Sequence, residues 1–272
     1  DDAVGGQVGR RIGREGTTGE NGERIVRRTF SLRMHDYIHF PEGKLAYNER
    51  MFTEIAPRYD FITRALSLGR DGAWKRRLVA MLPDVAAPVC LDLACGTGDL
   101  TFGLARRYLD GRIVGLDLTE AMLDRARRRN RFGERVAFVR ADMCETGLAD
   151  GSVDVVTGGY ALRNAPTVGR AVREIARVCK PGGTAALLDF SKPTGRAGRW
   201  LEYWLLRTWG DFWGWALHGN GEVYGYIAES LRQFPDRERL RAMFEDAGFE
   251  PVAGRRYYLG VTEVLVFRRR AW

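Results

Sequence analysis

Short, β-rich apolar runs alternate with helical stretches between residues 89 and 189, and this alternation constrains the fold more than any other feature of the sequence. The predicted elements are strand 89–93, helix 98–108, strand 112–117, helix 120–130, strands 136–140 and 153–157, helix 168–179 and strand 184–189. Strands joined through helices pair in parallel, with helices on both faces of the sheet. Residues 252–258 and 261–267 add a closing antiparallel pair. The sequence therefore predicts an α/β, Rossmann-like fold with a mostly parallel seven-stranded sheet.

The flanking segments predict additions to one domain rather than a second domain. With 272 residues, 45% of them hydrophobic, the chain is long enough for one large domain with a full core. Residues 1–45 begin with a stretch rich in Gly, Arg, Glu and Thr, and we interpret them as a flexible N-terminal extension. The predicted domain covers residues 46–272 and starts with helices that are broken at Pro57 and Gly69. Residues 192–234 interrupt the alternation and predict a helical lid insertion.

Composition narrows the class of protein. The four cysteines show no CxxC pairing and the three histidines have no metal-ligand spacing, so we expect a reducing compartment and no metal site. No apolar run of about 18 residues and no signal peptide is visible, which predicts a cytoplasmic protein without a transmembrane helix. The net charge of +8 suits nucleic acid or an anionic membrane surface. No nucleic-acid-binding module is recognisable, so we expect no nucleic acid as partner, but the charge alone does not decide between these surfaces.

The stretch 90–100, CLDLACGTGDL, places two glycines between the first predicted strand and the next helix. A glycine turn at the carboxyl end of a strand is a ligand site in open α/β sheets, because glycine lets a ligand approach the backbone closely. A dinucleotide site would require a third glycine at the position of Thr101. Asp99 stands at the helix N-terminus, where its carboxylate would repel a pyrophosphate. The sequence therefore disfavours NAD and FAD.

Three aspartates near the ends of successive strands suit S-adenosylmethionine (SAM) instead, because SAM has no phosphate. We expect Asp92 to accept a hydrogen bond from the SAM ammonium, directly or through water. Asp117 is expected to bind both ribose hydroxyls. Asp142 is expected to accept from the exocyclic amine of adenine, while the Met143 amide donates to a ring nitrogen. The alternative is that each aspartate only caps the helix or turn that follows it. Three of them beside the double-glycine turn favour SAM.

Several sequence blocks together carry a resemblance to a known family. The blocks are MFTEIAPRYDFITRALSLGRDGAWKRRLV, LDLACGTGDL, VGLDLTEAMLDRAR, GYALRNAP, REIARVCKPGG, LDFSKP and YGYIAESLRQFP, from about Met51 to about Phe249. They resemble the ubiquinone/menaquinone biosynthesis C-methyltransferases, which are class I SAM-dependent methyltransferases. The glycine loop is common to most class I methyltransferases, whereas ALRNAP, DFSKP and YGYIAES in this order are specific to the quinone family. The resemblance implies methyl transfer from SAM to a ring carbon of a quinol, with demethylmenaquinol favoured.

The resemblance also implies site residues. The implied cofactor contacts are Gly96, Thr97, Gly98, Asp117, Asp142 and Met143. Gly159 stands where the family has a serine, so a side-chain contact from that position is lost. Thr63 replaces an asparagine of the family and Asp189 a glutamate, and the family's C-terminal histidine is missing after Gly260. These departures affect the acceptor side more than the SAM side.

The implied reaction requires the ring hydroxyl to ionise and push negative charge onto the neighbouring carbon. A phenol has a pKa of about 10, and each unit by which a site lowers that pKa takes about 1.4 kcal/mol. A cation beside the oxygen lowers it, so we expect Arg163 to be catalytic and Asn164 to orient the quinol or a relay water. The alternative for Arg163 is a structural ion pair with Asp189 or Glu174. Residues expected to contact the acceptor are Tyr59, Tyr160 and Trp204.

Residues 199–218 hold five of the seven tryptophans, mixed with arginines. Indole rings prefer the headgroup layer of a membrane, and a polyprenyl quinol lives in the bilayer. We therefore predict a lid that lies at the membrane interface and admits the isoprenoid tail, on a protein peripherally associated with the inner membrane. The alternative is an ordinary amphipathic core helix. A homodimer is a further expectation.

Two other functions stay open. The departures on the acceptor side leave room for another phenolic or polyketide-like acceptor. A non-catalytic SAM-binding scaffold subunit is the alternative from another class, although a scaffold has no use for a full set of SAM contacts.

Overall fold

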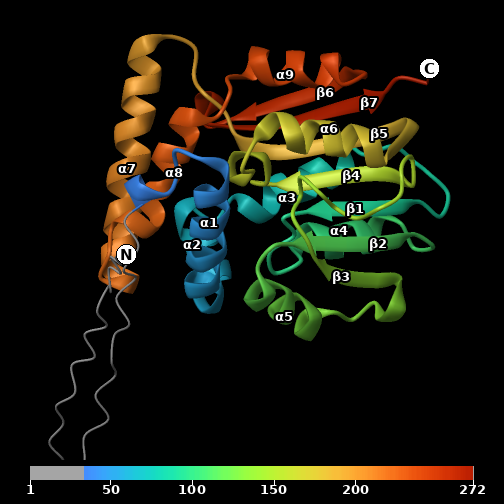
Figure 1. The fold of residues 1–272 in the computed structure, drawn as a ribbon, viewed down its shortest axis with the longest axis horizontal. Helices are drawn as coiled ribbons and strands as arrows, with labels where there is room; N and C mark the ends of the chain where they lie inside the picture. The colour runs from blue at the N-terminus through green and yellow to red at the C-terminus, as the bar shows by residue number, and fades with distance from the viewer. Residues whose placement is uncertain (1–33, 272) are drawn as a thin grey trace, which may run out of the picture.

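The computed structural model describes residues 34–271 and shows a seven-stranded sheet covered by helices (Figure 1). The strands are β1 (Val89–Leu93), β2 (Arg112–Asp117), β3 (Val136–Arg140), β4 (Val153–Gly159), β5 (Cys179–Phe190), β6 (Phe249–Tyr257) and β7 (Thr262–Arg269). The α-helices are α1 (Pro41–Ile55), α2 (Tyr59–Leu66), α3 (Asp71–Ala80), α4 (Asp99–Arg107), α5 (Glu120–Arg129), α6 (Val168–Val178), α7 (Arg196–His218), α8 (Glu222–Gln233) and α9 (Arg237–Asp246). Short 3-10 helices are η1 (Met34–Asp36), η2 (Ala56–Arg58), η3 (Gly133–Arg135), η4 (Leu162–Asn164) and η5 (Tyr258–Gly260). The predicted α/β, Rossmann-like fold is confirmed.

The strand order is β3-β2-β1-β4-β5-β7-β6, so the chain starts in the middle of the sheet and winds outward on both sides. β1 to β5 are parallel, and β7 lies antiparallel between β5 and β6. The direction of winding reverses between β1 and β4, and open α/β sheets bind ligands outside the carboxyl ends of the strands at such a point. β5 contains an irregularity before Thr184, because its pairing with β4 shifts from Val153–Cys179 to Val155–Thr184.

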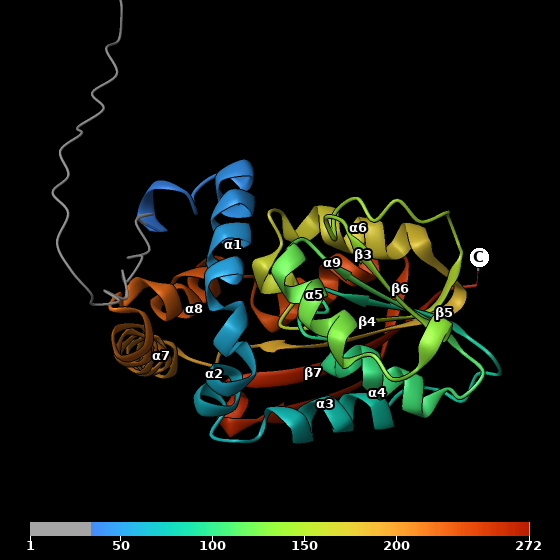
Figure 2. The same ribbon diagram turned by 90° about the horizontal axis from the view of Figure 1, so that it is seen from below.

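Helices cover both faces of the sheet, with α3 and α4 on one face and α6 and α9 on the other (Figure 2). Val155 and Val156 are neighbours on β4 but are buried in different clusters, because successive side chains of a strand point to opposite faces. Val155 is buried in one cluster with Trp74 of α3, and Val156 in another with Phe244 of α9. The near-continuous apolar runs of the parallel strands follow from this burial on both faces.

A third buried cluster lies at the end of the sheet to which the parallel strands point, where α1, α2 and α8 meet (Figure 1). It contains Tyr47, Ile62 and Tyr226, all of them buried. α7 packs along α8 at very short range, since a Cβ at Gly210 would lie 2.6 Å from the carbonyl oxygen of Tyr224. The helical insertion predicted at 192–234 is therefore a tightly packed helix pair, and it stands beside the carboxyl ends of the strands.

The N-terminal segment differs from the expectation of a flexible extension over residues 1–45. Residues 34–45 form η1 and the start of α1, and they bury Met34, Ile38 and Lys44. The rest of that predicted extension lies outside the described residues. None of the described helices is long and apolar enough to cross a membrane.

Candidate active site

Two adjacent cavities lie at the carboxyl ends of the parallel strands. The first is lined by the glycine loop and by the strand-end residues Asp117, Asp142 and Gly159. The second is larger, about 500 Å³, and is lined mainly by apolar side chains from α1, α2, α7 and α8. Four residues line both cavities: Phe52, Tyr59, Tyr160 and Asn164. These four mark the place where a ligand in one cavity meets a ligand in the other.

The carboxylate of Asp117 holds the glycine loop in place. Its Oδ2 accepts from the Gly96 amide at 2.8 Å and its Oδ1 accepts from the Thr119 amide at 2.9 Å. Gly96 has a φ of +55°, a left-handed conformation that suits glycine. Burial raises the pKa of Asp117, and the backbone hydrogen bonds oppose this shift. Asp117 thus stands at the end of β2 and lines the first cavity, where the sequence placed the ribose carboxylate.

Asp92 lies elsewhere than the sequence suggested. Its carboxylate is buried and accepts from the hydroxyls of Thr101 at 2.7 Å and Thr157 at 2.9 Å, and the residue does not line the first cavity. Burial raises the pKa of Asp92 to about 6. The expected contact with the SAM ammonium is therefore not supported by its position. Asp92 instead ties the first turn of α4 to β4 from below the loop.

Thr97 and Gly98 shape the loop without lining the first cavity. The Thr97 hydroxyl donates to Asp60 at 2.6 Å, and Arg129 donates to the Thr97 carbonyl oxygen at 2.9 Å. Gly98 has a φ of +90°, and a Cβ there would lie 2.8 Å from the ring of Phe102. Both residues therefore fix the turn into α4, and their contacts with a cofactor stay predictions.

The adenine-side residues do line the first cavity. Asp142 and Met143 follow β3, and the Asp142 side chain accepts from the Cys144 amide at 2.9 Å. This bond is the turn cap that the alternative interpretation proposed. It uses one acceptor position of the carboxylate, so other positions stay available to a ligand. Gly159 also lines the cavity, and a Cβ there would lie 2.9 Å from the end of the Leu100 side chain, which would have to shift to accommodate a larger residue.

The residues of the first cavity fit a SAM-like cofactor in their chemistry. Asn164 Oδ1 is buried at the junction of the two cavities and accepts no hydrogen bond from the protein, so an acceptor oxygen is available there. The first cavity is narrow, about 60 Å³, whereas ligand sites typically measure roughly 300–1,000 Å³. Phe52 and Tyr59 line both cavities, so a movement of their side chains would widen the first cavity for a nucleoside-sized ligand.

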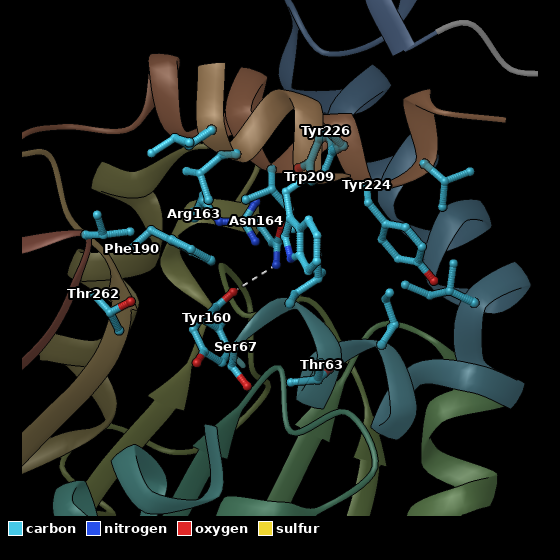
Figure 3. Close-up of a pocket in the computed structure, with 18 of the residues that line it drawn as sticks. Thr63, Ser67, Tyr160, Arg163, Asn164, Phe190, Trp209, Tyr224, Tyr226 and Thr262 are labelled. Carbon is cyan, nitrogen blue, oxygen red and sulfur yellow. Dashed lines mark hydrogen bonds between the residues drawn. The ribbon is translucent and has the colours of Figure 1, made fainter. Parts of the chain in front are cut away.

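The second cavity contains a cluster of polar side chains beneath the α7–α8 pair (Figure 3). Tyr160 has a φ of +59°, and its carbonyl oxygen accepts from the Asn164 side-chain amide at 2.8 Å. Asn48 of α1 donates to the Asn164 carbonyl oxygen at 2.7 Å. Burial raises the pKa of the Tyr160 phenol well above its ordinary value, and the neighbouring Asp71 adds to the shift. Tyr59 and Tyr160 therefore stay un-ionised at the junction, because burial also raises the pKa of Tyr59 to about 12.

Arg163 lines the second cavity and is also paired with Asp189. Its backbone amide donates to Asp189 Oδ2 at 3.1 Å, and its Nε lies 3.8 Å from Asp189 Oδ1. The guanidinium donates to the Ser230 hydroxyl of α8 and lies over the ring of Phe190, 5.3 Å from the centroid. Arg163 thus forms the structural ion pair and also lines the second cavity. Glu174, the other partner considered, pairs with Arg177.

The predicted acceptor contact from Trp204 does not fit the structure. Trp204 is 47% exposed on the outside of α7, and Trp209 lines the second cavity in its place (Figure 3). Sequence reasoning also missed Glu202, Phe190 and Tyr226, all of which line this cavity. The spacing of residues 202, 205, 206 and 209 places them on one face of a helix. The sequence therefore contained an indication that these four residues line one cavity.

Comparison with known proteins identifies the family of this chain. A model of the ubiE/COQ5 methyltransferase family matches residues 42–266. The chain belongs to this family. It is 40% identical over 201 residues to a demethylmenaquinone methyltransferase of Thermus thermophilus, which covers 73% of this chain and 91% of the relative. It is 38% identical over 206 residues to a 2-phytyl-1,4-naphtoquinone methyltransferase of Thermosynechococcus vestitus, covering 75% of this chain and 91% of the relative.

A solved SAM-dependent methyltransferase from Thermotoga maritima shares the fold of this ubiE/COQ5 family member, with a TM-score of 0.57 at 18% identity. The match covers 82% of this chain and 99% of that chain. The family resemblance expected from the sequence is confirmed, and the chain is a SAM-dependent methyltransferase.

The Asp117 hydrogen bonds generate a binding prediction. Asp117→Asn replaces one acceptor oxygen by an amide that faces a backbone donor, which costs about 1–3 kcal/mol. We expect the dissociation constant for SAM, measured by calorimetry, to rise about tenfold or more. Asp124→Asn on the exposed face of α5 is the matched control and should leave it unchanged. An Asp117→Asn variant that folds and binds SAM like the wild type would refute the role of this carboxylate.

Proposed function

We propose that this protein transfers the methyl group of SAM to a ring carbon of a quinol, with demethylmenaquinol as the favoured acceptor, in menaquinone or ubiquinone biosynthesis. The observation that carries the proposal is the pair of cavities that share Tyr59, Tyr160 and Asn164. A cofactor cavity that opens into a large apolar cavity suits a small polar methyl donor and a large apolar acceptor. The names of the two curated relatives, both of which methylate naphthoquinone-type compounds, support the same acceptor class.

The proposed cofactor site uses the strand ends. Asp117 and the Gly96 turn would hold the ribose side, and Asp142 and Met143 the adenine side. SAM supplies an electrophilic methyl group on its sulfonium when bound. The role of the protein is to bring the acceptor carbon to within about 3–3.5 Å of that methyl in line with the breaking bond. Side chains at the junction of the cavities, above all Tyr160 and Asn164, would fix this approach.

Arg163 is proposed to favour the ionised ring hydroxyl. A buried guanidinium stabilises a nearby phenolate more strongly than it would in water. Asp189 cancels part of this charge but also fixes the side chain, while Phe190 and Tyr226 flank it at 5.3 and 5.8 Å. Asn164 Oδ1, buried without a partner, is available to accept the hydrogen bond of the ring hydroxyl or of a relay water.

The outside of α7 is proposed to contact the membrane. Its exposed large apolar residues are Trp200, Leu201, Trp204, Leu205, Trp209, Phe212 and Trp215. An apolar face of this size is unusual for a protein in water alone, and indole rings favour the membrane interface. Leu205 belongs to this face and also lines the acceptor cavity, so the cavity reaches the same side of the molecule. We propose peripheral association with the inner membrane, from which the quinol enters.

The acceptor class can be tested by product analysis. Purified protein with SAM is incubated with reduced demethylmenaquinol, a demethoxylated ubiquinol precursor and a soluble phenol, and the products are identified by mass spectrometry. We expect a single added methyl on carbon for demethylmenaquinol, with less product from the ubiquinol precursor. Methylation of the soluble phenol alone would indicate another phenolic acceptor. Binding of SAM without any product would indicate a scaffold.

The role of Arg163 can be separated from its structural role. Arg163→Met alone leaves Asp189 buried and unpaired, which costs about 3–5 kcal/mol in stability. The double variant Arg163→Met with Asp189→Asn removes both charges, and Asp189→Asn alone is the matched control. We expect kcat of the double variant to fall about 100-fold or more, with the SAM dissociation constant within about threefold of wild type. Equal losses of turnover and SAM affinity would contradict the proposed role.

Membrane contact can be tested by flotation with vesicles that contain anionic lipid. Trp200→Ser with Trp215→Ser removes two exposed indoles from α7, each worth roughly 1.5–3 kcal/mol when buried, so binding should weaken at least about tenfold. Leu109→Ser is the control, because Leu109 is 71% exposed and lies in the turn between α4 and β2. Unchanged flotation would contradict membrane contact. Loss of a dimer instead would assign the same face to a subunit interface.

A further inference from the structure

Glu202 is a buried acid in the acceptor cavity that the proposed mechanism does not use. It lies on α7, is 5% exposed and lines the cavity of about 500 Å³. Its Oε1 is buried and has no hydrogen-bond partner. Among the described residues that line this cavity, it is the one carboxyl group. A buried polar group without a partner destabilises the fold, so its presence in the wall of this cavity points to a ligand.

The surrounding cations do not neutralise Glu202 by direct pairing. Lys192 donates to the backbone carbonyl oxygens of Arg232 and Phe234. Arg199 pairs with Asp236 at 3.7 Å, and Arg232 with Glu229 at 3.4 Å. Within the acceptor cavity, Arg163 is engaged with Asp189 and Ser230.

Glu202 is therefore a hydrogen-bond donor at neutral pH. Burial raises the pKa of Glu202 to about 8, although Lys192 and Arg199 act in the opposite direction. Below that pH the carboxyl group carries a proton and both donates and accepts hydrogen bonds. Above it the group becomes an anion, which no longer donates a hydrogen bond but still accepts one from a hydroxyl.

The position of Glu202 places it on the way out of the acceptor cavity. It also lines an outer groove of about 480 Å³ between α7 and α8, together with Trp200 and Trp204. It is the residue that the acceptor cavity shares with this groove. The junction with the cofactor cavity is formed by other residues, Tyr59 and Tyr160 among them. A tail that leaves the acceptor cavity toward the outside of α7 passes Glu202.

We propose that Glu202 binds the second ring oxygen of the acceptor, the oxygen next to the tail-bearing carbon, and so selects a 1,4-diol over a mono-phenol. This inference rests on the proposed quinol function. The methylated carbon and its hydroxyl lie at the junction with the cofactor cavity, near Arg163 and Asn164. The para oxygen then lies on the tail side of the ring, which is the side of Glu202. The carboxyl proton donates to that oxygen, and the carboxyl oxygen accepts from its hydroxyl.

The test compares a short-chain prenylated naphthalene-1,4-diol with its analogue that lacks the tail-side hydroxyl. Wild-type protein should methylate the diol with a kcat/KM about tenfold or more above that of the mono-hydroxy analogue. Glu202→Gln keeps both hydrogen-bonding functions and should keep this ratio. Glu202→Met should bring the ratio close to one by lowering the value for the diol alone. Glu229→Gln on α8 is the matched control, because Glu229 does not line the cavity and should leave the ratio unchanged.

The pH profile adds a readout that a structural role would not move. The KM of wild type for an analogue whose tail-side oxygen is a methyl ether, which only accepts hydrogen bonds, should rise above about pH 8, where Glu202 loses its proton, while Glu202→Gln shows no such rise. Titration of the remaining ring hydroxyl affects both proteins equally and cancels in the comparison.

Binding of both ligands is also followed by tryptophan fluorescence, since Trp209 lines the cavity. This readout does not depend on turnover, so it tests Glu202 even where neither ligand is methylated and the quinol function fails. A Glu202→Met variant that folds and keeps the wild-type preference for the diol, or a wild type without that preference, would overturn the inference.

Discussion

The two hydrogen bonds accepted by the buried Asp117 carboxylate determine how the rest of the site is arranged. They tie the end of β2 to the Gly96 turn after β1, at 2.8 Å, and to the Thr119 amide that precedes α5, at 2.9 Å. The first cavity exists because these bonds hold the glycine turn against the strand ends. The position of α4, and with it one face of the sheet, depends on the same turn. Arg163 and Asp189 play the corresponding part on the acceptor side, where they join η4 to β5.

The sequence was sufficient for the fold and for much of the cofactor side, because those features depend on local patterns. Alternating apolar runs predict the parallel strands, and strand ends of a parallel sheet meet at one edge, which brought Asp117 and Asp142 together. Asp92 lies within β1, as the predicted strand 89–93 implies, but the hydrogen bonds of its side chain to Thr101 and Thr157 could not be predicted from the sequence.

The acceptor side was harder to predict because it is built from elements far apart in the sequence. Trp204 and Trp209 lie on the same helix and are 47% and 39% exposed, yet of the two Trp209 alone lines the acceptor cavity. From the sequence, Asp189 was one of two candidate partners for an ion pair with Arg163. That Arg163 forms this pair and also lines the acceptor cavity depends on tertiary contacts. The unpartnered Glu202 is visible only once the burial of α7 is known.

The α7–α8 pair links the acceptor cavity to the proposed membrane contact. Its inner face closes the acceptor cavity with Trp209 and Tyr226, and its outer face exposes Trp200 and Trp215. One helix therefore serves as the roof of the site and as the proposed membrane contact. Under this proposal, a cofactor in the first cavity and an acceptor that enters from the membrane meet at Tyr160.

The central claim is that methyl transfer takes place where the two cavities meet. A crystal structure with S-adenosylhomocysteine and a short-chain quinol analogue tests it most directly. The sulfur should lie beside Tyr160 and Asn164, with the ring in the cavity of about 500 Å³ and its unsubstituted carbon facing the sulfur. A quinol ring bound outside this cavity, or a sulfur turned away from the junction, would contradict the claim.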